Sequence, residues 1–206
     1  MSTSASVTFI AEAELPTDFG LFQALGFEVE ATGEEVIALV SGPIGECPLV
    51  RLHSECLTGD ALSSQRCDCG PQLRAAQQTV IANGGMIIYL RQEGRGIGLL
   101  NKLRAYALQD QGMDTVDANL HLGFGADLRD YSVAANVLRA LGVTQLRLLT
   151  NNPAKVDGLT ENGIEVIERV GLVMEANTHN ASYLETKRER MAHQLPYLNG
   201  KSAETI

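Results

Sequence analysis

The stretch PQLRAAQQTVIANGGMIIYL, residues 71 to 90, decides the fold class because its hydrophobic period changes in the middle. Pro71 suits the first position of a helix, and the apolar residues from Leu73 to Ile81 follow helical spacing until Asn83 and two glycines stop it. MIIYL (86–90) is a short apolar run typical of a buried strand. A helix followed at once by a buried strand indicates an α/β fold.

The same alternation continues toward the C-terminus. A second helix is predicted over residues 98–111, and a third opens at Asp130, a good N-cap, and ends before Gly142. Strands are predicted at 146–150 and 163–170, with a helix starting at Pro153 between them. The inward face of the helix over 98–111 is expected to carry Leu99, Leu100, Leu103, Tyr106 and Ala107.

Residues 7 to 53 differ from the rest because they are mainly predicted strands, with VIALVSG and PLVRLHS as neighbours. We therefore predict an α/β fold with a mixed sheet, flanking helices and a strand-rich N-terminal part. No linker or internal repeat divides the chain, so residues 1–206 are expected to form a single domain with an ordered core at about 7–190. The tail from 194 to 206 is expected to fray.

Charge is distributed unevenly along the chain. The net charge is -9, and residues 1–50 contain eight acidic residues and no Lys or Arg, whereas residues 51–155 carry a net +2. An acidic chain is a poor nucleic-acid binder, but a local basic cluster can bind a small anion. The chain has neither a run of about 18 apolar residues nor a signal-peptide pattern, so we expect a cytoplasmic protein without membrane association.

Three of the four cysteines lie in RLHSECLTGDALSSQRCDCG (51–70), as Cys56, Cys67 and Cys69. In a cytoplasmic chain they are thiols or metal ligands rather than disulfides. Their spacing predicts one zinc ion with three protein ligands and a fourth position open for water, which is typical of a catalytic site.

Two other interpretations of these cysteines stay open at this point. A closed structural zinc site would use Cys47 or His53 as the fourth ligand, although such sites usually use paired C-x2-C knuckles. A zinc deaminase is suggested by His53-Ser54-Glu55, which mimics H-x-E, but that signature also needs P-C-x-x-C, and this chain has C-D-C.

Polar motifs follow the predicted strands directly. RQEGRG follows MIIYL, TNNPAK follows LRLL, and GADLRDY precedes the helix expected from Asp130. Arginine forks suit phosphate or carboxylate groups, and helix starts are natural anion sites. Taken singly, each motif is also compatible with a solvated turn or an N-cap with surface charge. Ligands of α/β sheets bind where the strands end, so we expect these motifs to meet there.

Taken together, RLHSECLTGDALSSQRCDCG, RQEGRGIGLLNKLRAYALQDQG, DTVDAN, LGFGADLRDY and LLTNNPAKV closely resemble the GTP cyclohydrolase II family of riboflavin biosynthesis. The resemblance runs from about residue 7 to residue 190. It leaves no room for the dihydroxybutanone-phosphate synthase domain of some relatives, so it implies the stand-alone form.

The resemblance implies a role for each matching position. The zinc ligands would be Cys56, Cys67 and Cys69. Asp127 would be the proton acceptor, Arg129 the proposed nucleophile toward the α-phosphate, and Tyr106 a residue beside the guanine that influences the product. The GTP-binding positions would be Arg51, Leu52, His53, Ser54, Glu55, Gln72, Glu93, Gly94, Arg95, Thr115, Thr150 and Lys155.

The implied reaction opens the imidazole ring of GTP at C8 and releases formate and pyrophosphate. It implies one Zn²⁺ per chain, Mg²⁺ with the triphosphate, and a homodimer. A guanidinium with a pKa above about 12 is a poor nucleophile, so we expect Arg129 to be a phosphate ligand. With three thiolates around the metal, Arg66 or the substrate is expected to compensate the negative charge. A nucleotide-binding regulatory protein that keeps zinc structurally is the alternative.

Overall fold

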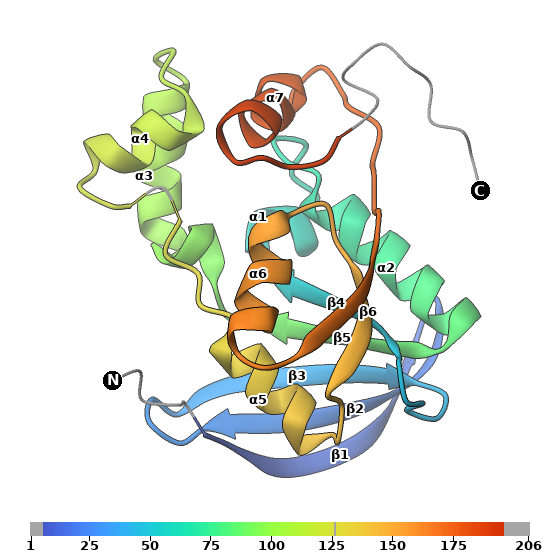
Figure 1. The fold of residues 1–206 in the computed structure, drawn as a ribbon. Helices are drawn as coiled ribbons and strands as arrows, with labels where there is room; N and C mark the ends of the chain where they lie inside the picture. The colour runs from blue at the N-terminus through green and yellow to red at the C-terminus, as the bar shows by residue number, and fades with distance from the viewer. Residues whose placement is uncertain (1–5, 126, 196–206) are drawn as a thin grey trace.

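The computed structural model describes residues 6–125 and 127–195, which form one sheet and its flanking helices (Figure 1). The strands are β1 (Val7–Thr17), β2 (Gly20–Val29), β3 (Glu34–Ser41), β4 (Leu49–Ser54), β5 (Gly85–Leu90), β6 (Gln145–Leu149) and β7 (Glu165–Val170). The helices are α1 (Leu57–Asp60), α2 (Cys69–Asn83), the 3-10 turn η1 (Glu93–Gly96), α3 (Leu99–Gln109), α4 (Thr115–His121), α5 (Ser132–Ala140), α6 (Pro153–Glu161) and α7 (Ala181–Arg190).

The sheet has seven strands in the order β1-β2-β3-β5-β4-β6-β7. The first four pair antiparallel in that order, and β5, β4, β6 and β7 are mutually parallel. The predicted α/β class, with a mixed sheet, flanking helices and a strand-rich N-terminal part, is confirmed. Because β4, β5 and β6 run parallel, their carboxyl ends lie at one edge of the sheet, and the loops that follow them converge there.

Helices cover both faces of the parallel part of the sheet. On one face, Met86 and Ile88 of β5 join a core that includes Val137 and Leu138 of α5. On the other face, Ile87 packs in a second cluster with Val80 of α2. This alternation is the two-residue period of a strand buried on both sides, which explains why MIIYL is apolar throughout.

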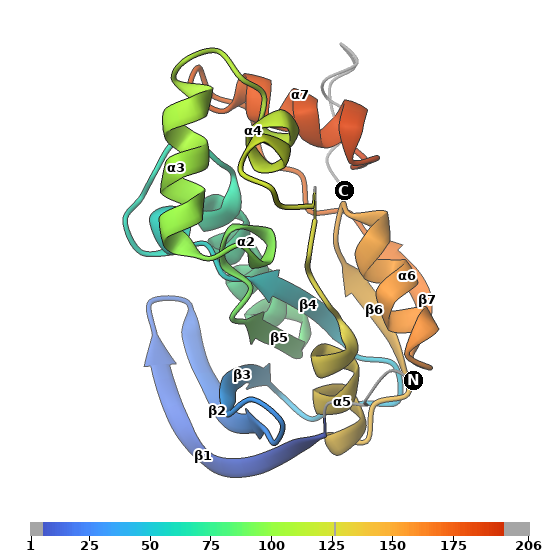
Figure 2. The ribbon, with the colours of Figure 1, turned by 90° about the vertical axis from the view of Figure 1, so that its left-hand side faces the viewer.

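A third group of helices lies away from the sheet core. Figures 1 and 2 show α3, α4 and α7 gathered at the end of the molecule opposite the curved β1–β3 strands. No helix within the described residues is both long enough and apolar enough to span a membrane.

Most predicted elements are confirmed, with small shifts at their ends, but VIALVSG (β3) and PLVRLHS (β4) are not neighbours, because β5 lies between them in the sheet. The helix predicted after residue 70 is α2, and the helix predicted at Pro153 is α6, where Asn152 caps the backbone N–H of Ala154 at 3.0 Å. The helix expected to open at Asp130 begins at Ser132, whose backbone N–H donates to Asp130 Oδ1 at 2.8 Å. Residues 196–206, most of the tail predicted to fray, lie outside the described residues.

The predicted inward face of α3 is wrong at Leu100, Leu103 and Ala107, whereas Tyr106 does face the cavity. Leu100 and Leu103 are 69% and 46% exposed, and Ala107 is also exposed, whereas Lys102 and Ala105 are buried. The inner side of α3 meets a polar cavity rather than the apolar core. The residues that α3 buries are therefore those that suit a polar cavity, and hydrophobic periodicity does not identify them.

Candidate active site

One cavity lies at the carboxyl edge of the parallel strands. Its wall is formed by the loops after β4, β5 and β6, together with side chains of α3, α4 and α7. The polar motifs that follow the strands in the sequence therefore do meet. The residues expected from the resemblance that line this cavity are Arg51, His53, Ser54, Glu55, Cys56, Cys67, Cys69, Gln72, Glu93, Gly94, Arg95, Tyr106, Thr115, Arg129, Thr150 and Lys155.

Two of the expected residues contribute differently. The side chain of Leu52 is fully buried in the core, and its backbone carbonyl accepts a hydrogen bond from Lys155 Nζ at 2.7 Å. Asp127 is not among the cavity-lining residues, but it is ion-paired with Arg129, whose Nε donates to Asp127 Oδ1 at 2.8 Å. Asp127 therefore orients the cavity's arginine from outside.

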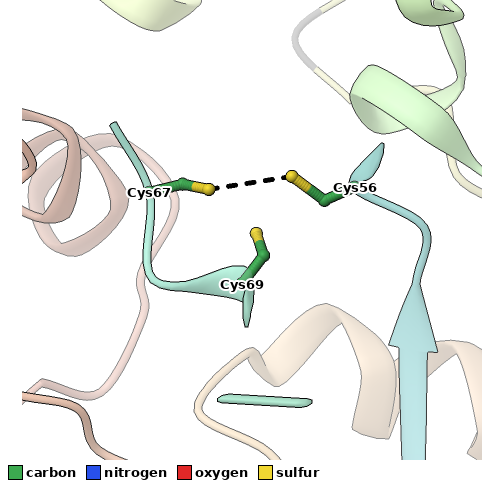
Figure 3. Close-up of side chains that lie close together, drawn as sticks. All are labelled: Cys56, Cys67 and Cys69. Atoms are coloured by element: carbon green, nitrogen blue, oxygen red, sulfur yellow. Dashed lines mark hydrogen bonds between the residues drawn. The ribbon is translucent and has the colours of Figure 1, made fainter. Parts of the chain in front are cut away.

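The three sulfur atoms of Cys56, Cys67 and Cys69 converge (Figure 3). They all lie within 4.8 Å of one another, and the Cys56 and Cys67 sulfurs are 3.7 Å apart. A tetrahedral zinc with Zn–S bonds of about 2.3 Å requires sulfurs about 3.8 Å apart. Within the described residues this is the one group of this kind, and neither Cys47 nor His53 belongs to it. The donor set therefore fits a metal with three protein ligands.

Two glycines allow this convergence. A Cβ on Gly59 would lie 2.9 Å from the Cys67 sulfur and 3.2 Å from the Cys56 sulfur. A Cβ on Gly70 would lie 2.2 Å from the backbone carbonyl oxygen of Gly59. A side chain at Gly70 would push the backbone of α1 away from α2, and a side chain at Gly59 would displace the sulfurs, so the two glycines let the three thiols approach one point.

Lys102 is the cation next to the thiols. Its Nζ donates to the Cys56 sulfur at 3.0 Å and to Glu93 Oε1 at 2.7 Å, and the residue is 8% exposed. Hydrogen bonds from Cys67 and Cys69, followed by the Lys102 charge, lower the pKa of the Cys56 thiol against its burial. The structure therefore supplies a compensating charge from α3, a position that the sequence did not single out.

Arg66, which we expected to compensate the thiolates, lies elsewhere. Its guanidinium stacks over the ring of Tyr106 at 4.8 Å and pairs with Asp110. Tyr106 itself lines the cavity from α3, and burial raises the pKa of its phenol. The phenol therefore stays protonated near neutral pH and can act as a hydrogen-bond donor.

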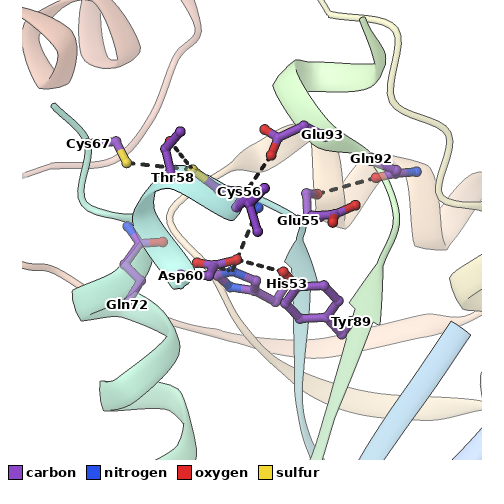
Figure 4. A network of polar contacts seen from close by, with 12 residues as sticks. His53, Glu55, Cys56, Thr58, Asp60, Cys67, Gln72, Tyr89, Gln92 and Glu93 are labelled. Atoms are coloured by element: carbon purple, nitrogen blue, oxygen red, sulfur yellow. Dashed lines mark hydrogen bonds and ion pairs between the residues drawn. The ribbon is translucent and has the colours of Figure 1, made fainter. Parts of the chain in front are cut away.

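A carboxylate network holds the first cysteine in place (Figure 4). Asp60 Oδ2 accepts hydrogen bonds from the Cys56 backbone N–H at 3.0 Å and from the Tyr89 hydroxyl at 2.8 Å. His53 Nε2 lies 3.0 Å from both carboxylate oxygens, and its ring stacks on Tyr89. Burial lowers the pKa of His53, so its imidazole is neutral and donates to Asp60 through Nε2. In that tautomer Nδ1, which is buried and unpartnered, is left as an acceptor.

Cationic groups outnumber carboxylates around the cavity. Arg51 donates to the Leu149 carbonyl at 3.0 Å and to Gln72 Oε1 at 2.7 Å, so part of its charge remains uncompensated by a carboxylate. Burial, followed by the charges of Arg51 and Arg129, lowers the pKa of Lys155 well below its usual value. A bound anion would relieve this penalty. The lining cations are Arg51, Arg95, Lys102, Arg129, Lys155 and Lys187, against the carboxylates of Glu55 and Glu93.

Sequence reasoning missed several lining residues. Lys102 was hidden inside the apolar spacing of α3, and Tyr183 and Lys187 lie on α7, a helix with little hydrophobic pattern. His193, to which the sequence assigned no role, also lines the cavity. The signal available for Lys102 was its position three residues after Leu99, on the face that Ala105 and Tyr106 continue.

These features define the class of site. Three thiols that can hold one metal ion lie beside a cation-rich cavity, at the carboxyl ends of the parallel strands. A family model described as GTP cyclohydrolase II matches residues 8–171. The chain belongs to the GTP cyclohydrolase II family.

Individual relatives agree with this membership. The GTP cyclohydrolase-2 of Hahella chejuensis is 58% identical over 193 residues, covering 92% of this chain and 93% of the relative. That of Escherichia coli O45:K1 is 59% identical over 189 residues, covering 90% of this chain and 96% of the relative. The riboflavin biosynthesis protein RibBA of Bacillus cereus is 58% identical over 192 residues, which are 92% of this chain but 48% of that protein.

Proposed function

We propose that this chain hydrolyses GTP in the first step of riboflavin biosynthesis. Three molecules of water are consumed: one opens the imidazole ring at C8, one releases formate, and one cleaves between the α- and β-phosphates and releases pyrophosphate. The product is 2,5-diamino-6-ribosylamino-4(3H)-pyrimidinone 5′-phosphate. The observation that carries the proposal is the placement of the thiol cluster and the cations in one cavity.

Cys56, Cys67 and Cys69 would hold one Zn²⁺. Zinc held by three protein ligands lowers the pKa of bound water toward neutrality, which supplies a nucleophile for a carbon as unreactive as C8. Lys102 adds a positive charge beside Cys56 and thereby offsets part of the negative charge of three thiolates. Asp60 holds the backbone N–H of Cys56, so the Cys56 sulfur is already in position before the substrate binds.

The triphosphate, with Mg²⁺, would occupy the cationic part of the cavity. Arg129 and Lys155 are the proposed phosphate ligands, and the proposed GTP contacts are the positions that match the family's motifs. Hydrogen bonding to Asp127 raises the pKa of Arg129 further above its usual value despite burial. A guanidinium held in its charged form is a poor nucleophile, so Arg129 stabilises charge on phosphate rather than attacking it.

Tyr106 is the proposed donor for the second hydrolysis. Its phenol lies in the cavity on the same side as Lys102, whose Nζ is 5.8 Å from the ring centroid. A protonated phenol there can donate a hydrogen bond to the formyl group of the ring-opened intermediate, and so assist release of formate.

The test incubates the purified protein with GTP and Mg²⁺ and measures formate and pyrophosphate separately. We expect both products, one zinc per chain, and loss of zinc and formate in Cys67→Ser. Cys47→Ser is the matched control, because Cys47 lies outside the thiol cluster. Formate production at the normal rate by zinc-free Cys67→Ser would refute the metal assignment. Binding of GTP without any turnover would favour a regulatory protein instead.

We further propose that the active form is a cytoplasmic homodimer. The exposed Leu100 and Leu103 lie three residues apart on α3, the helix whose Lys102 and Tyr106 line the cavity. Sedimentation equilibrium on the wild type and on Leu103→Glu tests this, and a monomeric wild type would refute it.

A further inference from the structure

The segment after residue 171 forms one wall of the cavity. Tyr183, Lys187, Met191 and His193 all line it, although the family match ends at residue 171. Figure 2 shows α7 beside α4 at the end of the molecule where the strands β4 and β6 point. Nothing in the proposed reaction uses this segment, so its position needs a reason of its own.

A buried ion pair joins this wall to the segment that carries Cys67 and Cys69. Lys187 Nζ lies 2.6 Å from Asp68 Oδ1, and the two side chains are 11% and 2% exposed. Asp68 stands between Cys67 and Cys69 in the sequence. Lys187 Nζ also lies 4.6 Å from the centre of the Tyr183 ring. Such a pair is costly to break, because removing one partner leaves the other charge buried alone.

The ion pair continues into the substrate side of the cavity. The other oxygen of Asp68 accepts a hydrogen bond from Gln72 Nε2 at 2.5 Å, and Gln72 Oε1 accepts from Arg51 at 2.7 Å. Arg51 in turn donates to the carbonyl of Leu149 at the end of β6. The chain of contacts therefore runs from α7 through the segment that carries Cys67 and Cys69 to α2, β4 and β6. Lys187 is therefore connected to Gln72 and Arg51 through Asp68, although it is distant from all three in sequence.

The rest of α7 is held weakly. Within its ten residues, all of them described, Leu184 is the one buried apolar side chain. Outside the ion pair the segment is fixed by Arg190, which pairs with Asp114 and donates to Asp117 at 2.9 Å, and by the Gln194 backbone N–H, which donates to the Asn151 carbonyl at 3.0 Å. An element with few buried apolar contacts opens at low free-energy cost.

The cavity that α7 borders is also small. Its volume is about 120 Å³, below the roughly 300–1,000 Å³ typical of small-molecule sites. Because α7 forms one side of this cavity, its position determines how much room a nucleotide has there. We propose that Lys187 is a positioning residue for the GTP reaction. Its ion pair with Asp68 holds α7 in place over the bound nucleotide and fixes the side chains of Gln72 and Arg51. This inference rests on the proposed function.

The experiment compares two substitutions that each remove one positive charge from α7. Lys187→Met breaks the ion pair with Asp68, whereas Arg188→Met removes a neighbouring charge that pairs with Glu185 and Glu189 of the same helix. Amide hydrogen exchange in zinc-loaded full-length protein is followed over residues 181–195 and over β4 and β5. The nucleotide probe is guanosine 5′-[β,γ-methylene]triphosphate with Mg²⁺, and turnover of GTP gives kcat and KM.

We expect the probe to slow exchange in residues 181–195 of the wild type and of Arg188→Met, and to slow it much less in Lys187→Met. Exchange in β4 and β5 should be the same in all three proteins. Because small misplacements of binding groups are costly, kcat/KM of Lys187→Met should fall on the order of 100-fold, mainly through KM. Lys187→Arg, which keeps the charge, should recover most of the loss.

Equal exchange and equal KM in Lys187→Met and Arg188→Met would overturn the inference. So would faster exchange throughout β4 and β5 of Lys187→Met, because that would indicate a general structural role. Failure of the proposed function is recognised separately: the wild type would then release no formate from GTP, whatever the exchange of α7 shows.

Discussion

The substitution Gly59→Ala tests whether the thiol cluster is a metal site shaped by the backbone. The new Cβ would lie 2.9 Å from the Cys67 sulfur, 3.2 Å from the Cys56 sulfur and 3.1 Å from the Cys69 Cβ. Ordinary contact distances are about 3.5–4.0 Å, so the nearest sulfur must move by at least about 0.6 Å. Metal sites tolerate displacements of about 0.2 Å. At least one sulfur therefore leaves the bonding position.

We expect zinc affinity to fall at least about 100-fold, which corresponds to about 2.7 kcal/mol. The fold should survive, because Gly59 has no left-handed backbone angle and alanine is favoured over glycine in a helix by about 1 kcal/mol. The assay is zinc competition against a chelator, combined with urea unfolding of the zinc-free protein.

Gly45→Ala is the matched control, because a Cβ at Gly45 meets nothing within 4 Å. Zinc affinity of Gly59→Ala equal to that of Gly45→Ala would refute the reasoning. A large loss of stability in the zinc-free protein would refute it as well, since the clash would then lie in the fold and not in the metal geometry.

Three further substitutions test the cavity. Lys102→Met should weaken zinc binding about 10- to 100-fold, measured by chelator competition, because Cys56 and the buried Glu93 lose their cation; unchanged affinity would refute the charge compensation. Tyr106→Phe should bind GTP but accumulate the formylated pyrimidine, detected by mass spectrometry, with a loss of formate release of about 100- to 1,000-fold; normal formate release would make the tyrosine a packing residue. His193→Gln should remove a pH dependence of α7. Burial, followed by the charge of Lys187 and then of Arg129 and Lys155, lowers the pKa of His193 to about 3. A detached segment would therefore take up a proton below about pH 6.5, which favours opening by up to about 1.4 kcal/mol per pH unit. Hydrogen exchange of α7 that is independent of pH in the wild type, after correction for intrinsic rates, would contradict this.

The sheet was predictable because its signals are local. MIIYL is an apolar run that follows two glycines, and LRLLT is mainly apolar and precedes two asparagines, so both strands are recognised without longer-range information. The convergence of RQEGRG and TNNPAK followed from the same signals, because parallel strands end at one edge. What the sequence could not supply is distance, and the 3.7 Å between the sulfurs of Cys56 and Cys67 depends on the contact of α1 with α2.

The error on α3 shows why the remainder could not be predicted. Hydrophobic periodicity assumes that a helix buries its apolar side against an apolar core. That assumption does not hold for α3. The buried ammonium of Lys102 is tolerated because a thiol and a carboxylate both accept hydrogen bonds from it, whereas Leu100 and Leu103 are exposed. Lys187 on α7 is tolerated for the same reason, through Asp68. Cys56 is 46 residues from Lys102, and Asp68 is 119 residues from Lys187, so no local pattern encodes these two contacts. In this fold a buried lysine is therefore a better marker of the cavity than an apolar helix face, and Lys155, which is also buried, lines the same cavity.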